Sequence, residues 1–303
     1  MRSSRRARPA ADFVRACVLT TAALLALTVA AARAQSAAPA VREPAAVLIG
    51  VEARRDRIRY HFDNPSSADT AFPVPHFFEQ TYDADHVWLV ATARYSAGVR
   101  METTIGVAPK RTVLADDYDT FFDPGGVVIV SGTTGGASGG AFLVSQRSDV
   151  ARLGPVQLSL GYRLRWDRFD FHVGHKTVTR NGTLIAATDV TSPERTDSQV
   201  HELPVGFRAA PRLVGLWHLS LSGEISPVTL ARLSVRLPEK YPGQDLIFVA
   251  KLFASSARVG LVRAGARWPI EIAVQADRTW SYRSTDRLSR PAQSVALSAG
   301  RSW

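Results

Sequence analysis

Apolar and polar side chains alternate with a period of two residues along much of the chain after residue 46. In the clearest stretch the apolar positions are Val156, Leu158, Leu160, Tyr162, Leu164 and Trp166, and the residues between them are Gln157, Ser159, Gly161, Arg163 and Arg165. Successive side chains of a β-strand point to opposite faces, so this alternation indicates a strand with one apolar and one polar face. Similar alternation at 232–237 and 270–277 predicts an all-β fold.

Alternating segments recur along the chain and are separated by polar connections. We expect strands at about 47–62, 76–95, 98–113, 141–166, 169–179, 201–222, 225–238, 246–263, 268–283 and 293–303. Long connections at 63–75, 114–140, 180–200 and 284–292, and a shorter one at 239–245, alternate with tight turns near 96–97, 166–169, 222–224 and 265–266. This order predicts an antiparallel up-and-down barrel of about ten strands, with eight or twelve as alternatives.

One strand boundary has two readings. The apolar positions change from even to odd numbers between Trp166 and Phe169, and a turn there explains the change. The other reading places the turn within 146–153 and a β-bulge at Asp167. The predicted number of strands is the same in both.

Alternation alone does not say what the apolar face contacts. In a soluble sandwich the apolar face packs into the core, whereas in a membrane barrel it contacts lipid and the polar face lines the interior. If the protein is a membrane barrel, we expect these side chains to contact lipid: Leu158, Leu160, either Leu216 or the favoured Leu219, Leu233, Ile272 and Val274.

Three features favour the membrane barrel. The segments run to about 10 residues or more, which is the length of a tilted membrane strand. Aromatic residues lie near segment ends, as in interfacial girdles; they are Tyr95, Trp166, Trp217, Trp268, Trp280, Tyr282 and Trp303. The last strand ends on Trp303, which resembles the C-terminal signal that outer-membrane assembly machinery reads.

The N-terminus has the layout of an export signal. Five arginines precede an apolar run at 17–32, and Ala32-Arg33-Ala34 has the small-x-small form of a signal peptidase site. We therefore expect residues 1–34 to be a cleaved signal peptide, 35–46 a short periplasmic segment and 47–303 the barrel. An uncleaved N-terminal anchor is the alternative.

Removal of the signal changes the charge and the cysteine content. The chain has a formal charge of +10, and residues 1–34 hold six arginines and one aspartate, so the mature part keeps +10 − 5 = +5. Much of the basic character is therefore discarded, and we expect no nucleic-acid partner. Cys17 is the only cysteine, which excludes disulfides and thiolate metal sites from the mature part. We expect no cofactor and no metal.

These features together predict a protein of the outer membrane of a Gram-negative cell envelope. The expected partners are outer-membrane lipid and lipopolysaccharide, with the barrel-assembly machinery during biogenesis. The sequence does not name a ligand.

Several charged side chains fall on the polar faces and should point into the lumen. They are Arg94, Arg163, Asp170, Lys176, Arg232, Arg236, Glu271 and Asp277. Such charges can line a narrow solute pore, or they can pair and fill a small barrel. Ten strands leave little room for an aqueous channel, so filling is the favoured interpretation.

An acidic stretch at 114–125 contains Asp117-Tyr118-Asp119. The order of strands and this Asp-x-Asp pair resemble the omptins, a family of ten-stranded outer-membrane proteases. The resemblance covers about 47–303 and is mainly architectural. It makes Asp117 and Asp119 catalytic candidates. Omptins also carry an Asp-x-His pair in a later outer loop, and no outer loop predicted here contains one. Asp170-Phe171-His172 has the right order but follows a predicted periplasmic turn.

Three functions remain open on these grounds. The favoured one is a non-catalytic barrel with a structural, adhesive or binding role, whose working surface is formed by outer loops 63–75, 114–140 and 180–200. The alternatives are an omptin-like protease and a narrow solute pore.

Overall fold

The computed structural model describes residues 45–64, 76–97, 99–122, 125–191, 194–238, 243, 245–263, 267–282 and 287–302. The expected signal peptide and the girdle residue Trp303 lie outside the described residues, and so does the predicted turn at 265–266. Those expectations therefore stay predictions. The described residues contain no helix long and apolar enough to cross a membrane.

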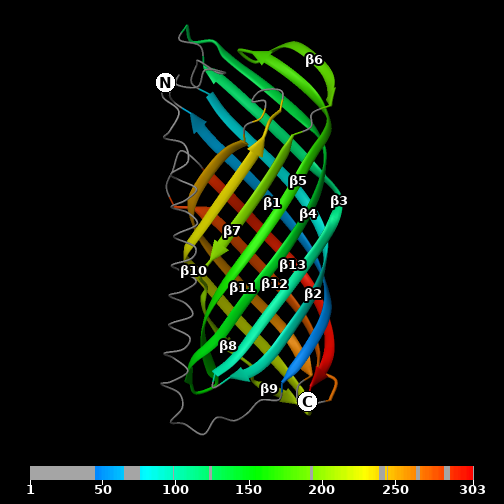
Figure 1. The fold of residues 1–303 in the computed structure, drawn as a ribbon, viewed down its shortest axis with the longest axis vertical. Helices are drawn as coiled ribbons and strands as arrows, with labels where there is room; N and C mark the ends of the chain where they lie inside the picture. Colours follow the sequence, from blue (N-terminus) through cyan, green and yellow to red (C-terminus); the bar gives the residue numbers. More distant parts are fainter. Residues whose placement is uncertain are drawn as a thin grey trace.

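The described chain is almost entirely β-strand (Figure 1). The strands are β1 (Ala46–Asn64), β2 (His76–Ala97), β3 (Val99–Phe122), β4 (Val128–Leu153), β5 (Val156–Arg180), β6 (Thr183–Thr191), β7 (Arg195–Glu202), β8 (Val205–Ala209), β9 (Arg212–Val214), β10 (Trp217–Arg236), β11 (Asp245–Arg263), β12 (Ile270–Ser281) and β13 (Arg287–Ser302).

Ten strand positions close into a ring. β1 pairs antiparallel with β13 on one side and β2 on the other. The ring continues through β3, β4 and β5, and closes through β10, β11 and β12. β7 and β8 together fill one position between β5 and β10. The predicted antiparallel barrel of about ten strands is confirmed.

The middle strands start and end at other residues than the sequence suggested. β5 runs unbroken through 166–169, and the turn lies at Gly154 and Pro155, next to the second reading's 146–153. The bulge of β5 lies near His172 instead of at Asp167. The predicted turn at 222–224 lies inside β10, and the chain turns at 210–216 instead.

The predicted loop 114–140 is mostly strand, because β3 extends to Phe122 and β4 begins at Val128. Gly132, Gly139 and Gly140 in this stretch allow close packing. A Cβ atom at Gly139 would lie 2.8 Å from the ring of Phe169, so only glycine lets that ring lie against β4. Loops 180–200 and 284–292 are likewise partly strand, since β6, β7 and β13 reach into them.

The barrel has two zones along its axis, which we name from β1. The membrane zone contains Val47–Ala53 of β1, where Val47, Ile49 and Val51 are exposed on the outer wall. The outer zone contains Arg54–Asn64, where the outward side chains Arg55, Arg57 and Arg59 are charged. The outer wall of the membrane zone continues as apolar side chains on neighbouring strands: Val87, Leu89, Ile105, Val107, Val259, Leu261, Ile272, Val274, Val295 and Leu297.

The outer zone has the opposite pattern, with an apolar core inside the barrel. The core includes Ile58, Tyr60, Phe62, Phe78, Tyr82, Val113, Phe169, Phe171, Leu233, Val235 and Leu252. Ring centroids lie 3.8 Å apart for Phe62 and Phe248 and 4.1 Å apart for Tyr82 and Phe169. Aromatic side chains from several strands therefore fill this end of the barrel.

β-Bulges allow the faces to exchange along a single strand. β3 has a register shift between Ala108 and Arg111, and β10 has one between Ser226 and Thr229. One extra residue reverses which side chains point inward. Leu233 therefore lies in the core and is 3% exposed, which corrects its expected contact with lipid.

Candidate functional site in the barrel lumen

The structure separates the eight charges that were expected to face the lumen. Arg94, Arg163, Glu271 and Asp277 lie inside and join a network of ion pairs. Lys176 is half-buried near the outer end of β5 and is outside the ion pairs described for the network. The remaining three, Asp170, Arg232 and Arg236, lie elsewhere.

Those three residues face the outer wall, and each has an identifiable reason. Asp170 lies between the buried Phe169 and Phe171 on an uninterrupted strand, so it points outward, where Lys110 and Arg195 bind it. The expected turn at 166–169 would have reversed its direction.

Arg232 and Arg236 lie beyond the bulge of β10, which turns Leu233 and Val235 inward. Arg236 instead pairs with Asp245 on the outer wall, at 2.8 Å from Nε to Oδ1. Their placement outside the barrel corrects the lumenal assignment.

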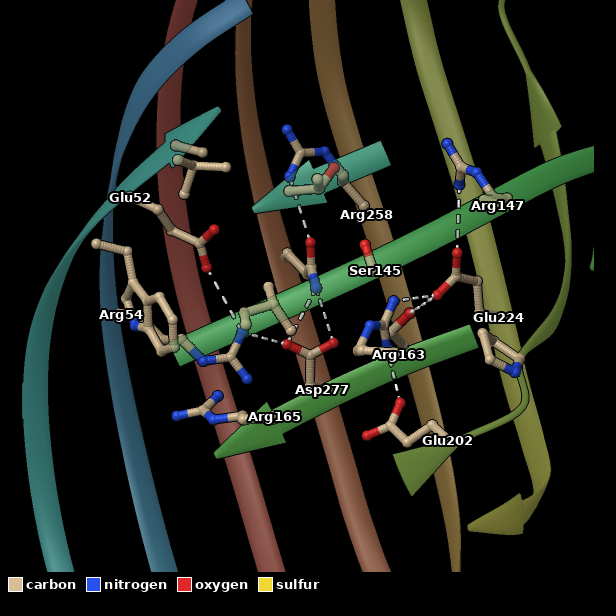
Figure 2. A pocket seen from close by; sticks show the side chains of 18 of the residues that line it. Glu52, Arg54, Ser145, Arg147, Arg163, Arg165, Glu202, Glu224, Arg258 and Asp277 are labelled. Atoms are coloured by element: carbon tan, nitrogen blue, oxygen red, sulfur yellow. Dashed lines mark hydrogen bonds and ion pairs between the residues drawn. The ribbon is translucent and has the colours of Figure 1, made fainter. Parts of the chain in front are cut away.

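A group of arginines and glutamates crosses the lumen in the membrane zone. Arg94 of β2 binds Glu102 of β3 at 2.8 Å and Glu271 of β12 at 2.9 Å. Arg147 of β4 binds Glu102 at 2.7 Å and Glu224 at 3.2 Å. Figure 2 shows Glu224 of β10 between Arg147 and Arg163. Among these bonds, Arg94–Glu271 and Arg147–Glu224 join strands that are not neighbours in the ring.

A second group lies where the two zones meet. Asp56 and Asp167 have no solvent exposure. Arg290 of β13 reaches both carboxylates, at 3.1 Å to Asp56 and 2.7 Å to Asp167. Arg165 of β5 also binds both, at 2.9 and 3.0 Å. Arg54 binds Asp56 at 3.2 Å and links this group to Asp277 at 2.6 Å (Figure 2).

Both groups are close to electrically neutral. The interior ion pairs involve eight arginines and nine acids. They are Arg54, Arg94, Arg147, Arg163, Arg165, Arg208, Arg258 and Arg290, with Glu52, Asp56, Glu102, Asp149, Asp167, Glu202, Glu224, Glu271 and Asp277. Burial of this many charges is tolerable only because each one is paired and hydrogen-bonded.

Most members of the network were missed from the sequence. Arg165 alternates with apolar neighbours in the clearest strand, so its polar face was visible. Asp56, in contrast, lies between Arg54, Arg55, Arg57 and Arg59, so both faces of this stretch carry charges. Only the register of β1 between β13 and β2 shows that Asp56 points inward while Arg55 and Arg57 point outward.

A cavity of about 210 Å³ lies among these side chains. Its lining includes Glu52, Trp88, Arg147 and Glu224, and it reaches Tyr60 at the edge of the outer zone. The guanidinium carbon of Arg165 lies 4.9 Å from the centroid of the Trp88 ring, a cation–π contact. The cavity therefore lies below the aromatic core, and ion-paired side chains line it.

The omptin-like candidates are not at a solvated loop tip. Asp117 and Asp119 lie on β3 and point into the barrel, each 7% exposed. Asp170 points the other way, to the outer wall. His172 is exposed at the bulge of β5. β5 is continuous, so this Asp-x-His sequence lies in the outer half of the barrel and not after a periplasmic turn, which corrects the earlier placement.

The arrangement is suited to holding strands together. The described residues include no group of three or more His, Cys, Asp or Glu side chains placed to hold a metal ion. In the ion-pair network, each carboxylate is bound by at least one arginine. A carboxylate whose oxygens are already bonded to arginine is poorly placed to accept a proton from a water molecule, so it is a poor general base.

The comparisons with known proteins identify the fold. No protein family matches the sequence, and no curated protein matches it. Among solved structures, the outer membrane protease OmpT from Escherichia coli matches with a TM-score of 0.61 and 7% identity, over 89% of this chain and 100% of OmpT. The chain has the fold of an outer-membrane β-barrel.

Two further barrels match with lower scores. Neisserial surface protein A has a TM-score of 0.33 and 9% identity, over 86% of this chain and 100% of its own. The beta domain of the Bordetella autotransporter BrkA has a TM-score of 0.36 and 10% identity, over 86% and 100%.

Proposed function

We propose that this protein is an exported, non-catalytic barrel of the outer membrane that conducts no solute and acts through its outer surface. Its role is structural, adhesive or ligand-binding. Outer-membrane lipid and lipopolysaccharide surround it, and the barrel-assembly machinery inserts it. The apolar wall of the membrane zone supports this location, because exposed apolar side chains in a continuous band belong in lipid.

The observation that carries the proposal is the filled interior of the outer zone. Tyr82 and Phe169 stack inside the barrel and are 1% and 0% exposed. Directly below them, Asp56 and Asp167 bind three arginines that come from β1, β5 and β13. A hydrated solute would have to displace both layers, so a pore is disfavoured.

The test is conductance of the purified barrel in a planar lipid bilayer. We expect no current steps above the baseline from protein whose folding is verified by heat-modifiable migration. A variant with Tyr82→Ala and Phe169→Ala removes two rings of the aromatic core and so widens the interior of the outer zone, while the ion pairs stay in place. A stable conductance in the unaltered protein would support the pore instead.

Working residues are expected on the outer wall and the outer loops. The outer zone presents cross-strand ion pairs such as Arg57 with Asp83 and Arg168 with Asp197. Pairs of this kind lie outside the apolar band, where lipid headgroups and other cell-surface molecules are in reach. Recovery of the exported chain as a soluble periplasmic protein, instead of in the outer-membrane fraction, would contradict the proposal.

The omptin-like protease is the second candidate, on the strength of the shared fold. Its chemistry needs the acidic pair and the Asp-x-His pair to face one water molecule. Here Asp117 and Asp119 point into the barrel while Asp170 points out of it. A β-sheet lies between the two pairs, which disfavours proteolysis.

A further inference from the structure

β6 is a strand with a free edge at the outer end of the barrel (Figure 1). It pairs with β5, and it pairs with no other strand in the described part of the chain. Leu184 and Ile185 are each 58% exposed, and nearly every other position of β6 is exposed as well. The ring strands, in contrast, have neighbours on both edges.

Free edges of this length normally carry features that block pairing with another chain, such as lysine, proline or inward charges. β6 contains no lysine and no proline, and Asp189 is its one charged residue. Oδ1 of Asp189 accepts a hydrogen bond from Nδ1 of His175 on the same hairpin, at 2.9 Å. A bulge at Ile185 disturbs one end, whereas 186–191 pairs with β5 in regular register. The edge is therefore open for strand addition.

We propose that β6 pairs with β6 of a second copy of this chain, antiparallel and centred on Ala187. The sequence of β6 is nearly symmetric about that residue. Centring on Ala187 places Thr183 opposite Thr191, Leu184 opposite Val190 and Ala186 opposite Thr188, while Ile185, the residue of the bulge, lies opposite Asp189. Thr–Thr and apolar pairs are favourable cross-strand neighbours.

The charge of Asp189 selects among the possible registers. Centring on Asp189 would place two carboxylates directly opposite each other, which is destabilising. Centring on Ala187 separates them by four residues, or about 13 Å along the strand. This distance exceeds the screening length of about 8 Å at physiological salt. Repulsion between the two copies is then small.

The position of β6 also permits this contact between barrels in one membrane. In Figure 1 the hairpin of β5 and β6 arches across the outer end of the barrel. A two-fold axis parallel to the barrel axis then brings two copies of β6 together in antiparallel orientation, while both barrels point the same way.

Cysteine cross-linking tests the pairing and its register. The full-length chain carries Cys17→Ser, which leaves no native thiol. Residues opposite each other in a β-pair have the separation that a disulfide requires. We expect Ala187→Cys to form a covalent dimer on mild oxidation of the refolded protein. Ala186→Cys and Thr188→Cys should each give little dimer alone and substantially more when mixed. No dimer at any of these positions would overturn the proposal.

A charge exchange at the same position tests it without oxidation. Ala187→Lys places two lysines opposite each other and should weaken the dimer about fivefold or more in sedimentation of detergent-solubilised protein. Mixing Ala187→Lys with Ala187→Glu should restore the dimer. Because Ala187 is exposed, both variants should keep the heat-modifiable migration of the folded barrel. A monomer at all concentrations in the unaltered protein would also overturn the proposal.

Discussion

Asp56 of β1 and Arg165 of β5 meet across the barrel interior, with 2.9 Å between Oδ2 and Nη2. β2, β3 and β4 separate their strands in the ring. Asp56 is fully buried, and its second oxygen accepts a bond from Arg290 of β13 at 3.1 Å. One carboxylate therefore ties three strands together at the level where the apolar wall ends and the aromatic core begins.

Removal of this carboxylate should destabilise the barrel strongly. Asp56→Ala leaves Arg165 and Arg290 buried with one partner fewer, and breaking a buried pair costs about 3–5 kcal/mol. Asp85→Ala is the matched control, since its pair with Arg55 is largely exposed and should contribute about 0–1 kcal/mol. Urea unfolding in detergent micelles measures both. Equal losses would show that the Asp56 group is not a structural tie.

A charged side chain on the outer wall of the membrane zone should destabilise the folded barrel, and the loss of stability should be larger nearer the bilayer midplane. Ile272→Arg introduces a charge on a lipid-facing position that is 48% exposed, and should cost about 2–4 kcal/mol if the position lies near the bilayer midplane. Gln275→Arg is the control, because Gln275 lies in the lumen and bonds to Asp277 at 2.9 Å. Refolding equilibria in lipid vesicles give the two values. A similar cost at both positions would contradict the assigned faces.

Deletion of 294–303 should prevent stable insertion. This segment supplies the pairing of β13 with Ala46–Arg54 of β1 and with Ile270–Gln275 of β12. Without it the ring has two unpaired edges in lipid, where unsatisfied backbone groups are costly. The amount of heat-modifiable protein in outer membranes is the readout. Substitution of Trp303 alone, in the intact strand, separates a role in assembly from a role in ring closure.

The refolded protein should not cleave peptides that contain dibasic sites, the preference of the omptins. Asp117 and Asp119 face the barrel interior, away from the Asp170 side of the sheet. Fluorogenic peptides provide the assay. Cleavage that disappears on Asp117→Ala, but persists in Asp116→Ala, would reveal a catalytic partner and favour the protease. Asp116 is the matched control because it neighbours Asp117 on β3 and lies on the other face.

The alternation of apolar and polar residues in the sequence was sufficient to predict the class of fold. The alternation from Val156 to Trp166 predicts a strand with Arg163 facing the lumen, and the structure places Arg163 there, with Arg165 on the same face. The ten-strand count also follows from the sequence. The count is right although the turns predicted at 166–169 and 222–224 are wrong. The structure has turns at 154–155 and 210–216 in their place, so the number of strands is unchanged.

Tertiary structure decided which face is the inside at each level of the barrel. A period of two residues states that neighbours point in opposite directions, and it carries no information about which direction is inward. In the membrane zone Ile272 faces out, whereas in the outer zone Leu233 faces in. The apolar side chains therefore form the outer wall in the membrane zone and the core in the outer zone, although the alternation along the strands is the same.

The lumen network depended on the register of distant strands. Asp56 and Arg290 are 234 residues apart in the sequence and 3.1 Å apart in space. Nothing local distinguishes Asp56 from its charged neighbours Arg55 and Arg57. The sequence by itself determined a closed antiparallel barrel with one apolar wall. Ring closure between β1 and β13, and the bulges that reverse the faces, decided which charges meet inside it.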